Sequence, residues 1–236
     1  MEPIPGDVVR ELAGLSDAAT LAGSARFFRE PVCCRGVKTA AVHAVARKHW
    51  KDVEPLGRAR ILALCEELYR TGYLEDGFVA ADWAAWIAPT FEPGDIDLLG
   101  AWVERYVDNW AACDTLCNHA VGDLVARFPE TVDSLLGWAA SENRWVRRAA
   151  AVSLVVPAKR GAFLDDALAI ADLLLLDRDD MVRKGYGWLL KEASRRHRDE
   201  VYAFVLARRD VMPRTALRYA VELMPPELRA GAMKRG

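Results

Sequence analysis

The segments NRWVRRAAAVSLV (residues 143–155) and DDMVRKGYGWLLK (residues 179–191) carry one pattern twice. Each begins with polar residues, continues with Val-Arg, and becomes a stretch of small residues interrupted by large apolar ones. Val146 and Val182 lie 36 residues apart. In a looser copy, MPRTALRYAVELM (residues 212–224), Pro213-Arg214 follows Val182-Arg183 by 31 residues. A recurrence of this length, with two helices per unit, is typical of stacked helical repeats.

The rest of the chain also has a helical pattern. Apolar residues recur at three- and four-residue spacing from Gly57 and again along residues 97–128. Good helix formers dominate, alternating strand patterns are almost absent, and Pro and Gly break the pattern at short intervals. We therefore expect an all-α fold, an α-solenoid of HEAT-like repeats that is curved with a basic concave face. It would form one domain over residues 1–236, with a helical cap at about 1–25 and a repeat body at about 26–224.

Charge is distributed unevenly along the 236 residues, although the formal net charge is only −2. Residues 143–236 hold 19 Lys and Arg against 12 Asp and Glu, a net of +7, and residues 1–142 have a net of −9. A basic half in a mildly acidic protein is typical of a surface that binds a polyanion. Ordinary solvated helix faces would explain the same numbers, so charge alone leaves both interpretations open.

Composition also excludes several protein classes. We see neither a long apolar run of transmembrane type nor a signal peptide, and the odd number of cysteines fits a reduced, cytoplasmic setting. Cys113 and Cys117 lie four residues apart, but two ligands do not close a zinc site, so we expect no metal. No nucleotide-binding or zinc-protease motif is present, and we expect no cofactor.

Four segments together resemble the AlkD-like DNA alkylation repair glycosylases, over about residues 26–224. They are FFREPVCCRGVKTAAVHAVARKHW (27–50), DNWAACDTLC (108–117), NRWVRRAAAVSL (143–154) and KGYGWLLKEASRRH (184–197). The family often has Pro after Gly-Val-Lys-Thr and Arg three residues later, where this chain has Ala40 and His43. These departures concern contacts with the DNA backbone rather than the fold.

The resemblance implies hydrolysis of the N-glycosidic bond of cationic purines such as 7-methylguanine and 3-methyladenine in duplex DNA, without flipping the base into a deep pocket. The alkylated base leaves as a neutral molecule, so positive charge collects on the deoxyribose. A carboxylate and aromatic faces stabilise such a sugar. The resemblance assigns this work to Asp114, Trp110 and Trp188. Trp110 lies one helical turn before Asp114, so both side chains should project from one helix face.

DNA contacts are expected at Lys38, Arg148, Lys191 and Arg195, because Arg and Lys suit phosphate oxygens. For Arg147 and Arg183 we favour a different role, in which HEAT-type arginines link adjacent repeats through acids such as Asp179 or Asp180. The same structural role stays open for Arg148, the one of the three that matches a family position.

Each assignment has a structural alternative. A tryptophan on an amphipathic helix usually belongs to the core, and Asp114 could pair with Arg148 for structure alone. At the level of function, a monofunctional, monomeric glycosylase without lyase activity is the favoured hypothesis. A noncatalytic HEAT-repeat protein that binds damaged or branched DNA, and a protein–protein scaffold, are the alternatives. The presence of Asp114, Trp110 and Trp188 together favours the enzyme.

Overall fold

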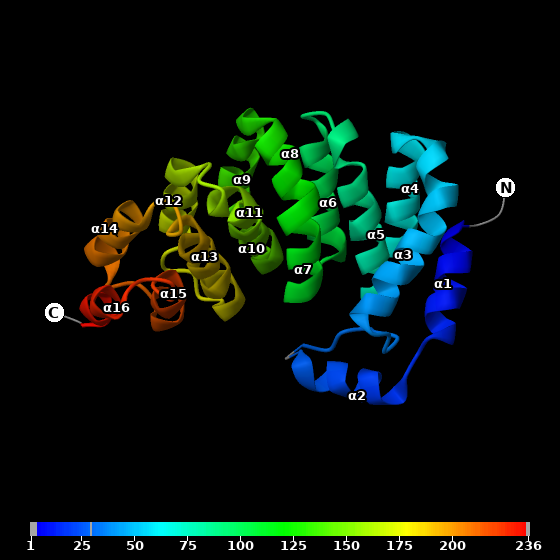
Figure 1. Ribbon diagram of the computed structural model, residues 1–236, viewed down its shortest axis with the longest axis horizontal. Coiled ribbons are helices and arrows are strands. Elements are labelled where there is room, and N and C mark those ends of the chain that lie inside the picture. The colour runs from blue at the N-terminus through cyan, green and yellow to red at the C-terminus, as the bar shows by residue number, and fades with distance from the viewer. Residues whose placement is uncertain (1–3, 29, 235–236) are drawn as a thin grey trace. The chain divides into compact units, whose positions relative to one another are not determined.

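The computed structural model describes residues 4–28 and 30–234, and across them the chain is helical with no β-strand. This confirms the predicted all-α class. None of the helices within these ranges has the length and apolar character needed to cross a membrane. The helices, labelled as in Figure 1, are α1 (Ile4–Gly14), α2 (Ala18–Phe27), α3 (Thr39–Val53), η1 (Glu54–Leu56), α4 (Arg58–Tyr69), α5 (Leu74–Trp86), η2 (Ala88–Thr90), α6 (Asp95–Tyr106), α7 (Trp110–Leu116), η3 (Cys117–Val121), α8 (Gly122–Arg127), η4 (Pro129–Thr131), α9 (Val132–Trp138), α10 (Arg144–Val152), α11 (Val155–Lys159), α12 (Leu164–Leu173), α13 (Asp180–Ala193), α14 (Arg198–Arg208), α15 (Arg214–Ala220) and α16 (Pro226–Met233).

Contacts between residues divide the chain into two compact units. Unit 1 contains the described residues up to Glu92 and Ala101–Leu116, and unit 2 contains Pro93–Gly100 and the described residues from Cys117 onward. The predicted organisation as a single domain and the predicted concave face stay predictions.

Unit 1 is built around α5, which packs against α3, α4 and α7. Trp83 of α5 is fully buried, and its indole N–H donates to the carbonyl of Ala46 in α3 over 3.1 Å. A buried indole that keeps a hydrogen bond adds a large apolar surface to the core without leaving a polar atom unpaired. Helix α2 runs across the direction of α1 and α3 (Figure 1) and is joined to α3 by the segment 30–38.

Unit 2 contains the sequence repeat as a stack of neighbouring helices. The three copies form α10, α13 and α15, and α13 packs directly against both of the others (Figure 1). The first two copies begin with equivalent caps, because Asn143 accepts from the amide of Trp145 and Asp179 from that of Met181. Such caps satisfy amides that a helix start leaves unpaired. The predicted repeat is therefore confirmed in this unit, and its first two copies match down to the residue that caps each helix, whereas α15 starts after Pro213 without a side-chain cap.

The stretch predicted as helical over residues 97–128 contains two irregularities. The chain leaves the helix at Val107–Asn109, where Asn109 is buried and its side-chain carbonyl accepts from the amide of Ala112 at the start of α7. Beyond α7, residues Cys117–Val121 form a π-helical turn, η3, before α8 begins. Such turns are rare and occur often at functional sites.

Candidate functional site

Helix α7 carries two of the predicted catalytic residues. Trp110 is its first residue and Asp114 follows one turn later, which places both on the same side of the helix. Both are half-buried, whereas Cys113 and Leu116 are fully buried and face the core. An α7 face that presents an indole and a carboxylate together, neither of them fully enclosed, is suited to a ligand that develops positive charge.

Two phenylalanines extend this face, and we did not assign them from the sequence. The ring of Phe27, at the end of α2, lies 5.3 Å from that of Trp110, and the ring of Phe28 lies 5.9 Å from it. Phe27 is 66% exposed, an unusual state for a large apolar ring. The three rings form an aromatic cluster, so α2 adds an open apolar wall beside Trp110. The Phe-Phe pair was visible in the sequence, but its contact with a tryptophan more than 80 residues later was not.

The segment between α2 and α3 is fixed by buried acids at the start of α5. Glu75 accepts from the backbone amides of Arg35, Gly36 and Val37 over 2.8–3.1 Å. Arg35 also forms a bidentate pair with Asp76, with both nitrogen–oxygen distances 2.8 Å. This pair raises the pKa of the Arg35 guanidinium.

Gly36 allows the same segment to approach α2 closely. Its φ is +78°, and a Cβ at this position would lie 2.7 Å from the Cβ of Leu21 and 2.8 Å from the carbonyl oxygen of Asp17. Only glycine accepts both constraints at once. Lys38, the predicted DNA contact, follows Gly36 by two residues and is exposed at the N-cap of α3.

The position where the family often has Arg is occupied by His43, whose Nδ1 lies 2.6 Å from a carboxylate oxygen of Asp82. The imidazole is held against α5 by this contact. Ala40 is exposed one turn earlier on α3.

In unit 2, Trp188 is half-buried on α13 and lies between two lysines. Lys184 is one turn before it and Lys191 about one turn after it, so the three share a helix face. The ammonium group of Lys191 is 2.8 Å from a carboxylate oxygen of Glu222. Arg195, beyond the end of α13, is exposed and donates to Glu192 over 2.6 Å, which raises the pKa of its guanidinium.

Two arginines of α10 connect one repeat to the next. Arg147 forms an ion pair with Asp177 at 2.6 Å and Arg144 one with Asp179 at 3.1 Å. Arg183, the counterpart of Arg147 in the next copy, donates to the carbonyl of Asp177. The interpretation favoured for Arg147 is therefore confirmed, whereas Arg183 makes its bond within its own repeat, to the backbone that precedes it.

Arg148 is only 5% exposed, and its guanidinium donates to the carbonyl of Met181 at the start of α13. This position supports the structural interpretation, because a buried guanidinium bonded to backbone has little surface left for a phosphate. A DNA contact at Arg148 stays a prediction.

The structure thus brings Trp110 and Asp114 together within unit 1, and it places Trp188 and Lys191 on one helix of unit 2. The assembly of all three candidate catalytic residues around one nucleotide stays a prediction, as do the DNA contacts at Lys38, Lys191 and Arg195. Within residues 4–28 and 30–234, no group of three or more His, Cys, Asp or Glu side chains is arranged to hold a metal ion.

Comparison with known proteins agrees with the arrangement of helices. A solved structure described as "Predicted DNA alkylation repair enzyme from Enterococcus faecalis" superimposes with a TM-score of 0.80, covering 89% of this chain and 97% of that chain. The two sequences are 17% identical, so the likeness shows a shared fold. No curated protein matched the chain. The sequence model of the family described as "DNA alkylation repair enzyme" matches residues 8–224. The chain therefore belongs to the DNA alkylation repair enzyme family.

Proposed function

We propose that the protein is a monofunctional DNA glycosylase that removes cationic alkylated purines, of the 7-methylguanine and 3-methyladenine type, from duplex DNA. The observation that carries the proposal is the face of α7, where Trp110 and Asp114 lie one turn apart and only half-buried. Membership of a family of DNA alkylation repair enzymes supports the substrate class.

The chemistry assigns a separate task to each group. The bond between C1′ of the deoxyribose and the purine nitrogen breaks, and its electron pair leaves with the base, which becomes neutral. The Asp114 carboxylate stabilises the positive sugar and holds the attacking water, whose oxygen bonds to C1′ and whose proton passes through Asp114 to solvent. The Trp110 and Trp188 ring faces add attraction for the sugar as its charge grows.

No lysine is needed for covalent attachment to the sugar, so the product is an abasic site in an unbroken strand. The exposed aromatic wall of Phe27 beside Trp110 also supports an open site, in which the base is not enclosed. An enzyme of this type should release a bulky N3-linked adenine adduct as well as a methylated base.

The decisive experiment measures base release from duplex DNA that contains 7-methylguanine, for wild type and Asp114→Asn. The substitution keeps the shape but removes the charge, and we expect the rate to fall roughly 100-fold or more. Asp123→Asn is the matched control, because Asp123 is exposed on α8 and should leave the rate unchanged. No release by wild type would refute the proposed activity. Equal rates for wild type and Asp114→Asn would refute the role of this carboxylate.

A double-mutant cycle tests whether Trp110 and Trp188 act on the same transition state. Two rings that act on one sugar should show rate losses that are clearly non-additive when both are replaced by Ala. Thermal unfolding of each variant monitors the fold. Strictly additive losses would show that the two tryptophans act independently and would contradict the joint assignment.

A further inference from the structure

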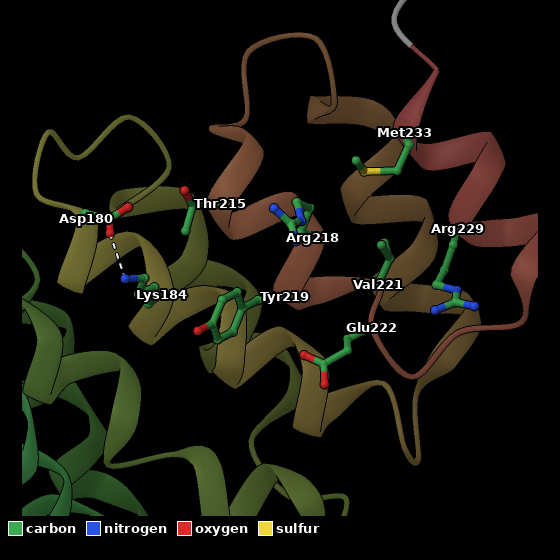
Figure 2. Close-up of a pocket in the computed structure, with 9 residues that line it drawn as sticks. All are labelled: Asp180, Lys184, Thr215, Arg218, Tyr219, Val221, Glu222, Arg229 and Met233. Carbon is green, nitrogen blue, oxygen red and sulfur yellow. Dashed lines mark ion pairs between the residues drawn. The ribbon is translucent and has the colours of Figure 1, made fainter. Parts of the chain in front are cut away.

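Helices α13, α15 and α16 of unit 2 surround a cavity of about 560 Å³ that contains none of the candidate catalytic residues (Figure 2). We call this cavity the C-terminal pocket. The charged side chains that line it are Asp180, Lys184, Arg218, Glu222 and Arg229.

The charges of the pocket leave two guanidinium groups available. Lys184 is paired with Asp180 at 2.8 Å, and Glu222 is paired with Lys191 at the same distance. Arg218 and Arg229 are exposed and form no ion pair with any carboxylate in the described part of the chain. Figure 2 shows that they come from different helices, α15 and α16. Two guanidinium groups that line one cavity without acidic partners suit an anion with several oxygens.

Hydroxyl groups complete the set of donors. Thr215 and Tyr219 of α15 line the same cavity. Side-chain hydroxyls of Thr and Tyr, together with Arg, are among the groups that most often contact DNA phosphates. The lining therefore favours a phosphate over a carboxylate-bearing peptide, which would need fewer donors.

The pocket borders the face of α13 that carries Trp188. Lys184, one turn before Trp188, lines the pocket itself, and Lys191, on the other side of Trp188, is paired with the pocket residue Glu222. Helices α13 and α15 meet closely between these lysines, since a Cβ at Gly187 would lie 2.8 Å from the Cβ of Tyr219. A phosphate in the pocket would therefore lie beside whatever contacts Trp188.

We propose that the C-terminal pocket binds a backbone phosphate of duplex DNA and so extends the DNA-binding surface from α13 to α15 and α16. The inference rests on the proposed function, since the duplex would be the one whose damaged nucleotide meets Trp188. Arg218 and Arg229 are the primary phosphate contacts, and Lys184 adds charge. Asp180 and Glu222 fix the two lysines on α13 rather than compete for the phosphate.

The test compares DNA binding by wild type, Arg218→Ala/Arg229→Ala, and a control double variant, Arg160→Ala/Arg198→Ala. The control removes the same charge from exposed positions of unit 2 that do not line the pocket. Fluorescence anisotropy with an undamaged duplex, over a series of salt concentrations, gives affinity and its salt dependence without requiring catalysis. We expect the pocket variant to bind at least about tenfold more weakly, with a salt slope smaller by about 1, while the control stays near wild type.

Equal losses in the two double variants would overturn the inference, because the effect would then be one of net charge. Unchanged DNA affinity in the pocket variant, with calorimetric binding of inorganic phosphate that depends on Arg218 and Arg229, would also overturn it in favour of a small phosphorylated ligand. Either result leaves base release by wild type intact, so failure of the pocket is distinguishable from failure of the glycosylase. Thermal unfolding of the variants shows whether each is folded, and a charge-reversed Arg218→Glu/Arg229→Glu protein should lose still more affinity.

Discussion

The Glu75 carboxylate organises the segment that joins α2 to α3, and replacing it with Ala is expected to loosen this segment. The side chain is 3% exposed and accepts from three consecutive backbone amides, those of Arg35, Gly36 and Val37. In the Glu75→Ala protein these donors lose their acceptor. The amides of Gly36 and Val37 are the critical ones, because both residues are buried and water reaches them poorly.

The size of the effect follows from these two amides. A buried donor without a partner costs about 1–3 kcal/mol. The two costs do not add fully, because water can enter the space left by the side chain, so we expect a loss of about 2–4 kcal/mol in the free energy of unfolding. Glu67→Ala provides the control: Glu67 is exposed, its ion pair with Arg60 lies on the surface, and its loss should change stability by less than about 0.5 kcal/mol.

Two measurements together test this reasoning. Urea denaturation gives the change in global stability, and native-state hydrogen exchange reports the protection of the amides at positions 36 and 37. We expect these amides to exchange much faster in Glu75→Ala, at denaturant concentrations where the rest of unit 1 stays protected. A loss below about 1 kcal/mol, or unchanged protection at both positions, would show that Glu75 does not hold the segment.

Three further outcomes are expected. Gly187→Ala should lower the free energy of unfolding, measured by urea denaturation, by about 1–3 kcal/mol, because α13 and α15 must move apart. The control Gly137→Ala should be neutral or stabilising, because a Cβ at Gly137 meets nothing within 4 Å. A larger loss of stability in Gly137→Ala than in Gly187→Ala would refute the close packing of α13 and α15. Hydrogen bonds from Lys48 and His49 lower the pKa of Glu11. The Glu11 carboxylate therefore stabilises the fold at pH values above the ordinary Glu pKa of about 4.3, and this stabilisation is lost as the pH falls and the carboxylate is protonated. Glu11→Gln should therefore lower the melting temperature at pH 7 and have less effect at pH 3. Burial raises the pKa of the Cys65 thiol, so a thiol reagent should modify the exposed Cys33 first and reach Cys65 only after unfolding; early labelling of Cys65 would contradict its burial.

The repeat in unit 2 was predictable because its signals are local. The caps Asn143 and Asp179, 36 residues apart, occupy the same place at the starts of α10 and α13. Since each signal depends on a few neighbouring residues, sequence spacing alone identified helices that pack against one another. The link between repeats through Arg147 was predictable for the same reason, although its acid is Asp177 rather than the expected Asp179 or Asp180.

The surroundings of Trp110 could not be predicted in this way. Its contact with Phe27 depends on the direction of α2, which is fixed by the close approach of Gly36 to Asp17 and by the acceptor Glu75 on another helix. These contacts join residues about 20 to 80 positions apart, and no periodic pattern reports them. The helix start at α7 carries a more local signal. Asn109 lies three residues before Ala112, whose amide it caps, and an Asn in this position is a recognisable start of a helix.

The two glycines of α13 have a consequence for directed evolution of lesion preference. A Cβ at Gly185 would lie 3.3 Å from the side chain of Arg148 in α10, whereas a Cβ at Gly187 would lie 2.8 Å from the Cβ of Tyr219 and 2.9 Å from the carbonyl oxygen of Ala216 in α15, so Gly187 should stay glycine in any selected library. Lys184 and Lys191 flank Gly187 along the same helix, but their side chains are not fully buried and can vary without disturbing the stack. One helix therefore combines a position intolerant of substitution with neighbouring positions open to variation. A library limited to the open positions would sample new substrate contacts while most of its members still fold.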